Sequence, residues 1–354
     1  MTRKETSGTY GIILLNYKIE MKSTSSASFL LAPLFLVDYI RNFFDQKYTC
    51  GASSYYLLRY LYVITRGLSR HILTAPYVAF YPPDKNTMRS LAVAKEISRN
   101  GYYFIKPDIT TRSLCHDIKT KLSNCSVKEL GGINNGSTHR TFGDAYSRAS
   151  YSSARLDHNR SDVISIPEVW KLISHIDAYS IASSYLNCSP ILTSVDSWYV
   201  VPFAGPNDGA FDAYSDAAQS FHYDMDWIKF VKFFINLDNV DEDSAPFEFV
   251  PSSHKLAMMN LRQDRRLYDS EADSLSVVKA LGEAGSVFIA DTSGYHRDGR
   301  ANISRTRHVL QVEFAVSTFG AKFQYDRINA SCKLPDVSSI NRELSSRALV
   351  LWQN

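Results

Sequence analysis

Three chemically reactive side chains open one apolar segment of the sequence at alternate positions. The stretch FHYDMDWIKFVKFF (221–234) carries His222, Asp224 and Asp226 ahead of a run rich in Ile, Val and Phe. In an extended strand, side chains at i and i+2 point to the same face, so His222 and Asp224 aim at one point. An imidazole beside a carboxylate is half of a common transition-metal site. His-x-Asp alone occurs by chance in many proteins, so its meaning depends on the rest of the chain.

A second histidine in a suitable context follows about seventy residues later. In the stretch GSVFIADTSGYHRDGR (285–300) an apolar run ends, and His296 follows in a short turn. Together with His222 and Asp224 it would form a facial triad of two histidines and one carboxylate, which holds Fe(II) and leaves other coordination positions open. A structural zinc site would instead be closed by four ligands. Asp224 is preferred to Asp226 because the nearer i, i+2 pair converges with less distortion of the chain.

An open-faced iron of this kind needs electrons to split dioxygen. The usual donor is 2-oxoglutarate, which chelates iron through its keto-acid end and leaves a far carboxylate to be neutralised by the protein. Arginine suits this role because it is always charged and can form a bidentate fork. Arg300, Arg305 and Arg307 all follow His296. Arg305 and Arg307 have the same parity along the chain, so alternation alone does not choose between them.

The elements that must position these residues change in character near residue 190. After it come short β-rich runs divided by Gly, Pro and Asp/Asn clusters, the pattern of an antiparallel sandwich or barrel. Before it, the segments 28–72, 87–101 and 166–187 have helical spacing, and 28–72 is predicted to hold two helices. Several β runs are apolar on both faces, as expected if N-terminal helices cover one sheet. We therefore predict an α+β chain with an N-terminal helical extension (1–92), a main domain (93–330) whose β core spans about 190–318, and a helical tail (331–354).

Composition places the chain among ordinary globular proteins. It is 45% apolar, 21% charged and 13% aromatic, enough for a sizeable core. A net charge of +3 is too small to argue for a nucleic-acid partner. The five cysteines include no CxxC pair, which favours a reduced, cytoplasmic chain over a disulfide scaffold or zinc module. The N-terminus lacks the order of segments found in a signal peptide.

The most apolar stretch, 28–44, is interrupted by Pro33, Asp38 and Arg41, so no membrane span is expected. The neighbouring segment 55–72 reads as a basic amphipathic helix, which leaves peripheral contact with a membrane surface as the minority interpretation.

Taken in order, the motifs resemble the phytanoyl-CoA dioxygenase family of Fe(II)/2-oxoglutarate-dependent oxygenases over about residues 93–316. The resemblance rests on AKEISRNGYYFIKPDI, on IASSYLNCSPIL, on FHYD with the later turn PSSHK, and on GSVFIADTSGYHRDGRANISRTR. It implies a double-stranded β-helix, or jelly roll, with Fe(II), 2-oxoglutarate and O2 as cofactors and cosubstrates, and His222, Asp224 and His296 as ligands. It selects Arg307, eleven residues after His296, as the arginine for the cosubstrate. Asn302, in the Asn-x-Ser element, and Trp227 complete the expected cofactor contacts.

One departure from the family pattern concerns the residue two positions after the second histidine. The family often has a small hydroxyl residue there that helps to hold the cosubstrate, and this chain has Asp298. An ionised aspartate would repel a carboxylate. Another donor must then serve, or the cosubstrate lies differently.

The expected activity is hydroxylation of a C–H bond of a polar small molecule, with release of succinate and CO2. Because Asp224 is retained, halogenation is not expected, since it needs that ligand position for halide. Desaturation or cyclisation, a peptide or lipid substrate, and a non-catalytic jelly-roll binding or sensor protein stay open as alternatives. Two polar segments, 131–162 and 204–220, are interpreted as lids over the site or as disordered loops, with equal weight. Their polarity favours an anionic substrate, and the candidate substrate contacts are Tyr223, Asp226, Arg297 and Arg300.

Overall fold

The computed structural model describes most of the segment from residue 26 to residue 319. The described residues are 26–45, 52–65, 67–84, 86–130, 136–148, 155–201, 220–255, 266–267, 271, 274–299, 305–319, 347–349 and 351. Arg300, Asn302, most of the segment 204–220 and most of the predicted helical tail lie outside the described residues.

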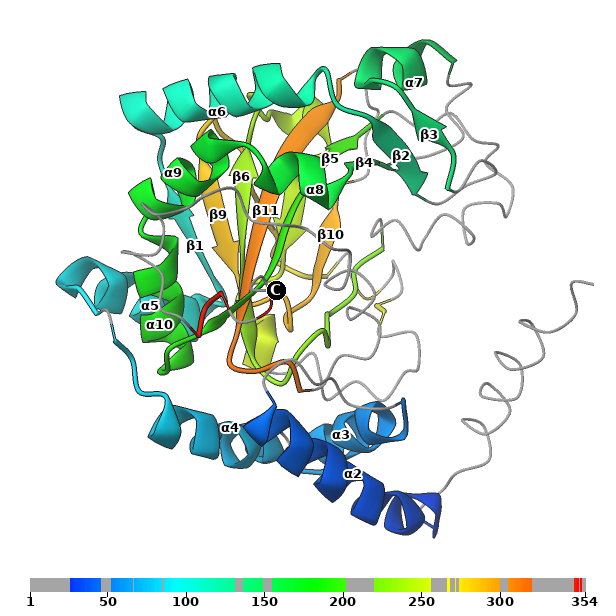
Figure 1. Cartoon of the computed structure of the whole chain (residues 1–354), viewed down its shortest axis with the longest axis vertical. Coiled ribbons are helices and arrows are strands. Elements are labelled where there is room, and N and C mark those ends of the chain that lie inside the picture. The colour runs from blue at the N-terminus through cyan, green and yellow to red at the C-terminus, as the bar shows by residue number, and fades with distance from the viewer. Residues whose placement is uncertain are drawn as a thin grey trace, which may run out of the picture.

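Two antiparallel sheets form the β core (Figure 1). The strands of the larger sheet, in spatial order, are β1 (Tyr102–Ile105), β9 (Val287–Ala290), β6 (Phe230–Asn236), β11 (Arg307–Ala315), β5 (Ile191–Val200), β4 (Arg155–His158), β2 (Val127–Leu130) and β3 (Thr138–His139). The smaller sheet has the order β10 (His296–Asp298), β7 (Phe247–Phe249) and β8 (Val278–Lys279).

From β5 onward the chain passes back and forth between the two sheets. The segment at His222 pairs with His296 at the edge of the smaller sheet, and it lies between β5 and β6 of the larger sheet in sequence. The chain then enters β7 and β8 in the smaller sheet, β9 in the larger, β10 in the smaller and β11 in the larger. This alternation is the double-stranded β-helix that the sequence predicts, and it confirms the predicted fold class.

The two-residue period of the strands separates a helix-facing side from an interior side. On β11, Leu310, Val312 and Phe314 belong to the large apolar cluster shared with the helices. The alternate residues Gln311 and Glu313 instead line a pocket between the sheets. Because β11 is central, its register places Glu313 opposite Ser194 of β5 and Lys232 of β6. Polar residues from three strands therefore meet on one inner face.

Helices cover the outer face of the larger sheet (Figure 1). They are α5 (Met88–Asn100), α6 (Ile109–Leu122), α8 (Arg160–Ile164), α9 (Pro167–His175) and α10 (Ala178–Leu186). Capping boxes at Thr87 and Asp108 begin α5 and α6. Gly101 ends α5 at φ +85°, and a Cβ there would lie 2.6 Å from His254 Nδ1, so the helix end needs glycine. The predicted helix at 87–101 and its glycine stop are confirmed.

A second helical layer lies at the lower end of the β core in Figure 1. It comprises α2 (Ser26–Phe44), α3 (Ala52–Ile64) and α4 (Leu68–Phe80). The prediction of two helices in 28–72 was wrong, because Gly67 at φ +82° separates α3 from α4. None of the described helices is long and apolar enough to span a lipid bilayer.

The polar segment 131–162 is more ordered than its composition indicated. Its described residues form β3, α7 (Phe142–Arg148), β4 and the start of α8. Elsewhere in the chain, two short helical turns, η2 (Glu242–Ser244) and η3 (Ser253–Lys255), flank β7. Strand β4 pairs with both β2 and β5, so part of this segment extends the larger sheet. Strand β4 was not predicted because its sequence has only one large apolar residue, Leu156, between Arg155 and Asp157.

Two buried histidines, His158 of β4 and His308 of β11, lie close to each other. The rings of His158 and His308 are 5.3 Å apart, and His308 stacks on Tyr199 at 3.9 Å. Burial lowers the pKa of His158 from 6.5 to about 4. Burial, with His158 next in importance, holds the pKa of His308 well below its usual value.

These histidines predict acid sensitivity of the fold. The unfolded chain binds a proton at His158 near pH 6.5, whereas the folded chain does so only near pH 4. The stability contributed by neutral His158 is therefore complete above pH 6.5 and is lost as the pH falls toward 4, by roughly 3 kcal/mol in all. Denaturant unfolding at pH 7, 5.5 and 4.5 should show His158→Phe with a smaller acid-induced loss than wild type. His116→Phe, at an exposed site on α6, is the control; equal pH slopes for both variants would refute the interpretation.

Candidate metal centre

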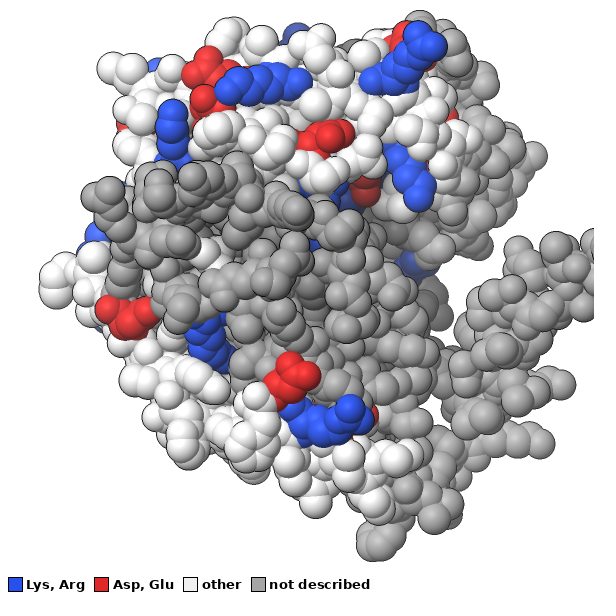
Figure 2. Space-filling view, in the orientation of Figure 1, with Lys and Arg blue, Asp and Glu red and all other residues white. Residues whose placement is uncertain are grey.

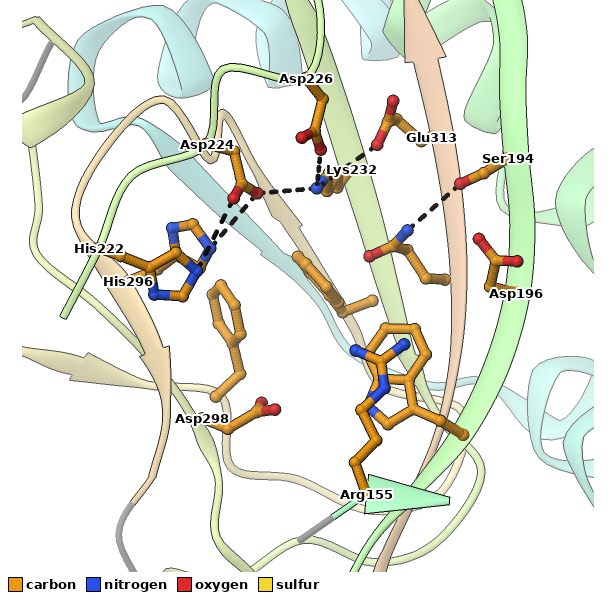
Figure 3. Close-up of a pocket in the computed structure, with 14 residues that line it drawn as sticks. Arg155, Ser194, Asp196, His222, Asp224, Asp226, Lys232, His296, Asp298 and Glu313 are labelled. Carbon is orange, nitrogen blue, oxygen red and sulfur yellow. Dashed lines mark hydrogen bonds and ion pairs between the residues drawn. The ribbon is translucent and has the colours of Figure 1, made fainter. Parts of the chain in front are cut away.

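The structure brings the two histidines and the carboxylate of the predicted triad together. His222 and His296 pair as neighbouring strands, with backbone hydrogen bonds of 2.9 and 3.0 Å in the two directions. Asp224 Oδ1 lies 3.7 Å from His222 Nε2, and its Oδ2 lies 3.4 Å from His296 Nε2. One donor atom from each of the three residues lies within 4.8 Å of the others. Figure 3 shows the three side chains converging on one side of a pocket.

Backbone carbonyls orient both imidazole rings. His222 Nδ1 lies 2.9 Å from the Ser220 carbonyl, and His296 Nδ1 lies 2.9 Å from the Gly294 carbonyl. A carbonyl can only accept a hydrogen bond, so each Nδ1 carries a proton, and in the neutral ring Nε2 then presents a lone pair. Oriented neutral imidazoles of this kind are typical ligands of Zn, Cu, Fe and Ni. The donor set therefore suits a divalent transition metal.

A buried lysine neutralises the triad carboxylate. Lys232 Nζ lies 2.8 Å from Asp224, 2.7 Å from Asp226 and 3.4 Å from Glu313. Burial alone would raise the pKa of Asp224, but Lys232 and then the two histidines outweigh it and hold that pKa well below its usual range. Burial likewise opposes the charge on Lys232, but the three carboxylates hold its pKa well above the usual value. Asp224 is thus an ionised carboxylate before any metal binds.

The neighbouring carboxylates have different environments. Asp226 is bound by Lys232 and does not belong to the group of three candidate donors, which fits the preference for Asp224. Glu313 accepts hydrogen bonds from Thr193 Oγ1, at 2.8 Å, and from Trp227 Nε1. Burial raises the pKa of Glu313 to about 7, against the opposing effect of Lys232. Glu313 therefore exchanges a proton near neutral pH.

The triad opens into a pocket of about 170 Å³ between the two sheets. Its wall is mostly ionised and polar, with three aromatic side chains, Trp198, Phe234 and Phe247. The lining residues are Arg155, Ser194, Asp196, Trp198, His222, Asp224, Asp226, Lys232, Phe234, Phe247, His296, Asp298, Gln311 and Glu313.

The structure separates the candidate arginines. Arg305 is 64% exposed and pairs with Asp241 at 2.5 Å on the surface. Arg307 is buried on β11, and its Nη2 donates to Asp298, a residue of the pocket wall. Arg307 therefore stands behind Asp298, one residue removed from the pocket.

Three predicted contact residues lie elsewhere than expected. Tyr223 was predicted at the substrate, but it is fully buried in the core cluster beside the helices and is absent from the pocket wall. Trp227 was predicted at the cofactor, but it lies behind Glu313 as its hydrogen-bond donor. Arg297 was predicted at an anionic substrate, but its Nε donates to Glu248 at 2.7 Å and its guanidinium lies 4.2 Å from the Phe221 ring. The i, i+2 rule explains these positions, because Tyr223 and Arg297 have the opposite parity to the triad residues beside them.

Several pocket residues were missed by reasoning from the sequence. Lys232 is the only charged residue between Phe230 and Asn236, and Glu313 is a single acid inside another apolar run. A lone charge in an otherwise buried strand was the available signal, because such a charge must find a partner inside the protein. Arg155 gave no such signal, since its strand was not recognised.

Comparison with known proteins gives distant structural similarity only. No protein-family model matches the chain, and no curated protein matches its sequence. The resemblance to the phytanoyl-CoA dioxygenase family therefore stays a prediction.

Three solved structures illustrate the level of similarity. The epimerase SnoN, in complex with Fe3+, alpha ketoglutarate and nogalamycin RO, is 12% identical over 64% of this chain and 83% of its own, with a TM-score of 0.46. The carbocyclase SnoK from nogalamycin biosynthesis is 16% identical over 63% and 82%, with a TM-score of 0.43. EctD from S. alaskensis, with 2-oxoglutarate and 5-hydroxyectoine, is 13% identical over 66% and 76%, with a TM-score of 0.43. Similarity at this level does not establish what this chain binds or which reaction it catalyses.

The first prediction from the site concerns metal binding. Full-length protein should bind one equivalent of Co(II), used as an air-stable stand-in for Fe(II), by titration calorimetry. Each of His222→Ala, His296→Ala and Asp224→Ala removes one of three converging donors and should abolish stoichiometric binding. Asp226→Asn is the matched control and should retain it, because Asp226 faces Lys232 rather than the imidazoles. Loss in Asp226→Asn with retention in Asp224→Ala would transfer the carboxylate role to Asp226.

The second prediction concerns the lysine that balances the carboxylates. Lys232→Met leaves buried carboxylates without their cation and should lower the metal-free stability by ~3–5 kcal/mol. Added Co(II) should recover part of this loss, because a ligand that binds the folded state stabilises it. Lys229→Met is the control: that lysine is half-buried on the neighbouring stretch of chain, but it donates to the Tyr185 carbonyl at 3.0 Å. A loss in Lys229→Met equal to that in Lys232→Met, with no recovery on adding metal, would contradict the assigned role.

Proposed function

We propose that this chain is an Fe(II)- and 2-oxoglutarate-dependent oxygenase that hydroxylates a small, polar molecule. The observation that carries the proposal is the set of two Nε2 lone pairs and one ionised carboxylate at the wall of the pocket. Three ligands from one side leave coordination positions that face the cavity, as an oxygen-activating iron requires. Asp224 fills the ligand position that a halide would need, which argues against halogenation.

The metal and cosubstrate, when bound, supply the oxidising chemistry, with succinate and CO2 as co-products. The protein's own groups orient and shield that chemistry. The Nδ1 hydrogen bonds hold the imidazole rings, and Lys232 holds Asp224 in its ionised form. Phe234 and Phe247, stacked at 4.5 Å, line the pocket and limit access of water to the metal position.

Arg307 is our candidate for holding the far carboxylate of 2-oxoglutarate, with Arg155 beside it. Both pair in register with Val200 of β5, Arg307 from β11 on one side and Arg155 from β4 on the other. Arg155 lines the pocket, stacks 4.0 Å over the Trp198 ring and is held by Asp157. The two arginines thus flank the same position of the larger sheet.

The pocket wall also supports a polar substrate. Ser194 and Gln311, joined at 3.3 Å, offer neutral hydrogen-bonding groups on the side of the pocket opposite the triad (Figure 3). A pocket of about 170 Å³ suits a small molecule. Basic and acidic side chains of the described residues are intermixed on the face shown in Figure 2.

Succinate release tests the proposed activity. Anaerobically prepared protein with Fe(II), 2-oxoglutarate and oxygen should form succinate, and a panel of small polar metabolites should contain compounds that accelerate it. His296→Ala should reduce the rate to background because it removes a metal ligand. Stoichiometric metal binding without succinate from any member of the panel would favour the non-catalytic binding or sensor protein instead.

A further inference from the structure

Asp298 occupies a position between the metal triad and Arg307. It lies on β10, two residues after His296, and therefore on the same face of the strand. Its Oδ1 accepts a hydrogen bond from Arg307 Nη2 in a buried ion pair, with side-chain exposures of 9% for Asp298 and 2% for Arg307. Asp298 lines the pocket, whereas Arg307 does not.

The second arginine at this end of the pocket is also held by a carboxylate. Arg155 makes a two-pronged contact with Asp157, at 2.5 Å from Nε and 3.2 Å from Nη2. Figure 3 places Asp298 and Arg155 on facing sides at the end of the pocket away from Asp226. Two arginines and two aspartates therefore balance, and this end of the pocket offers no excess positive charge to an incoming anion.

One donor at the same place is nevertheless unused. Arg307 Nε is buried and makes no hydrogen bond to any of the described residues. Buried guanidinium nitrogens are nearly always hydrogen-bonded, so an unpaired one indicates a missing acceptor. Arg307 therefore has a carboxylate on one nitrogen and no described acceptor on another.

We infer that Asp298 sets the cosubstrate specificity of this site, because it binds Arg307 as the far carboxylate of 2-oxoglutarate would. The inference rests on the proposed function and deepens it. A second carboxylate arriving at Arg307 meets Asp298 at close range in a buried site, where repulsion between like charges is weakly screened. The diacid must either displace Asp298 from Nη2 of the arginine or bind the unpaired Nε beside it, against that repulsion. A 2-oxo acid without the far carboxylate lacks the charge that Asp298 would repel.

This arrangement predicts how two ligands of similar size compare. In wild type, 2-oxoglutarate should bind no more than about tenfold more tightly than 2-oxopentanoate, which has a methyl group where 2-oxoglutarate has its far carboxylate. Asp298→Asn removes the charge and keeps the shape, so it should tighten 2-oxoglutarate binding by at least about tenfold. It should leave 2-oxopentanoate binding unchanged within about twofold, since that ligand does not compete for Arg307. The tenfold thresholds correspond to the removal of the repulsion between Asp298 and the far carboxylate, a pair of like charges that is partly buried.

The measurement is titration calorimetry of each ligand into Co(II)-loaded, full-length protein, which reads binding without turnover. The double variant Asp298→Asn with Arg307→Met should lose the gain, because the gain requires the arginine. Asp241→Asn is the matched control, since it removes an aspartate from the exposed pair with Arg305; it should change neither affinity. Asp298→Ser provides a second test if the asparagine variant does not fold.

The outcomes are distinguishable. A wild-type protein that already prefers 2-oxoglutarate by two orders of magnitude, with no further tightening in Asp298→Asn or Asp298→Ser, overturns the role of Asp298 and leaves the proposed function standing. Binding of Co(II) but of neither 2-oxo acid, in wild type and variants alike, overturns the proposed function and this inference with it.

Discussion

The arrangement of the site depends on one buried ammonium group. Lys232 enters the pocket from β6 because the strand's alternation sends its apolar neighbours, Val231 and Phe233, into the core beside the helices. There it meets Asp224 and Asp226 from the preceding loop and Glu313 from the adjacent strand β11. Without that cation three carboxylates would face one another in a buried cavity, which costs several kcal/mol per unpaired charge. Lys232 therefore keeps Asp224 ionised and in a position from which it could bind a metal ion.

A second buried charge pair fixes the other half of the site to the helical layer. Arg70 of α4 donates to Asp291 at 3.2 Å and to the Ile228 carbonyl at 3.0 Å, so one side chain holds the segments that carry both candidate histidines. Asp291 also accepts hydrogen bonds from Tyr185 and from the Ser293 backbone N–H. The turn from Asp291 to His296 is thus set by contacts to α4 and α10. The N-terminal helices contribute to the position of His296 as well as to the core.

The triad could be predicted from the sequence because the pattern that indicates it lies within short stretches of the chain. Alternation places His222 and Asp224 on one face, and a glycine-bounded β run ending near His296 predicts a second strand beside them. The β runs kept their period and their turn residues and so predicted an antiparallel sandwich or barrel, whereas the double-stranded β-helix was implied by the family resemblance. The positions of Tyr223 and Arg297 could also have been corrected by parity. The places of Lys232 and Arg155 in the pocket could not have been assigned in this way, since they depend on how β6 pairs with β11 and β4 pairs with β5, and the sequence of a single strand does not specify that register.

Charge balance links the two ends of the pocket and explains why a divalent metal ion would fit there. The ionisable groups that line it, with their direct partners, comprise six acids and four bases: Asp157, Asp196, Asp224, Asp226, Asp298 and Glu313 against Arg155, Arg160, Lys232 and Arg307. Because the pKa of Glu313 is about 7, the metal-free pocket carries between one and two net negative charges near neutral pH. A divalent cation at the triad removes this imbalance. A dianionic cosubstrate restores it, and it does so most directly at Asp298, the one acid that stands between the metal position and Arg307. If a metal binds at the triad as we propose, the surplus of carboxylates that favours it at one end of the pocket also makes the other end selective about the anion that binds next.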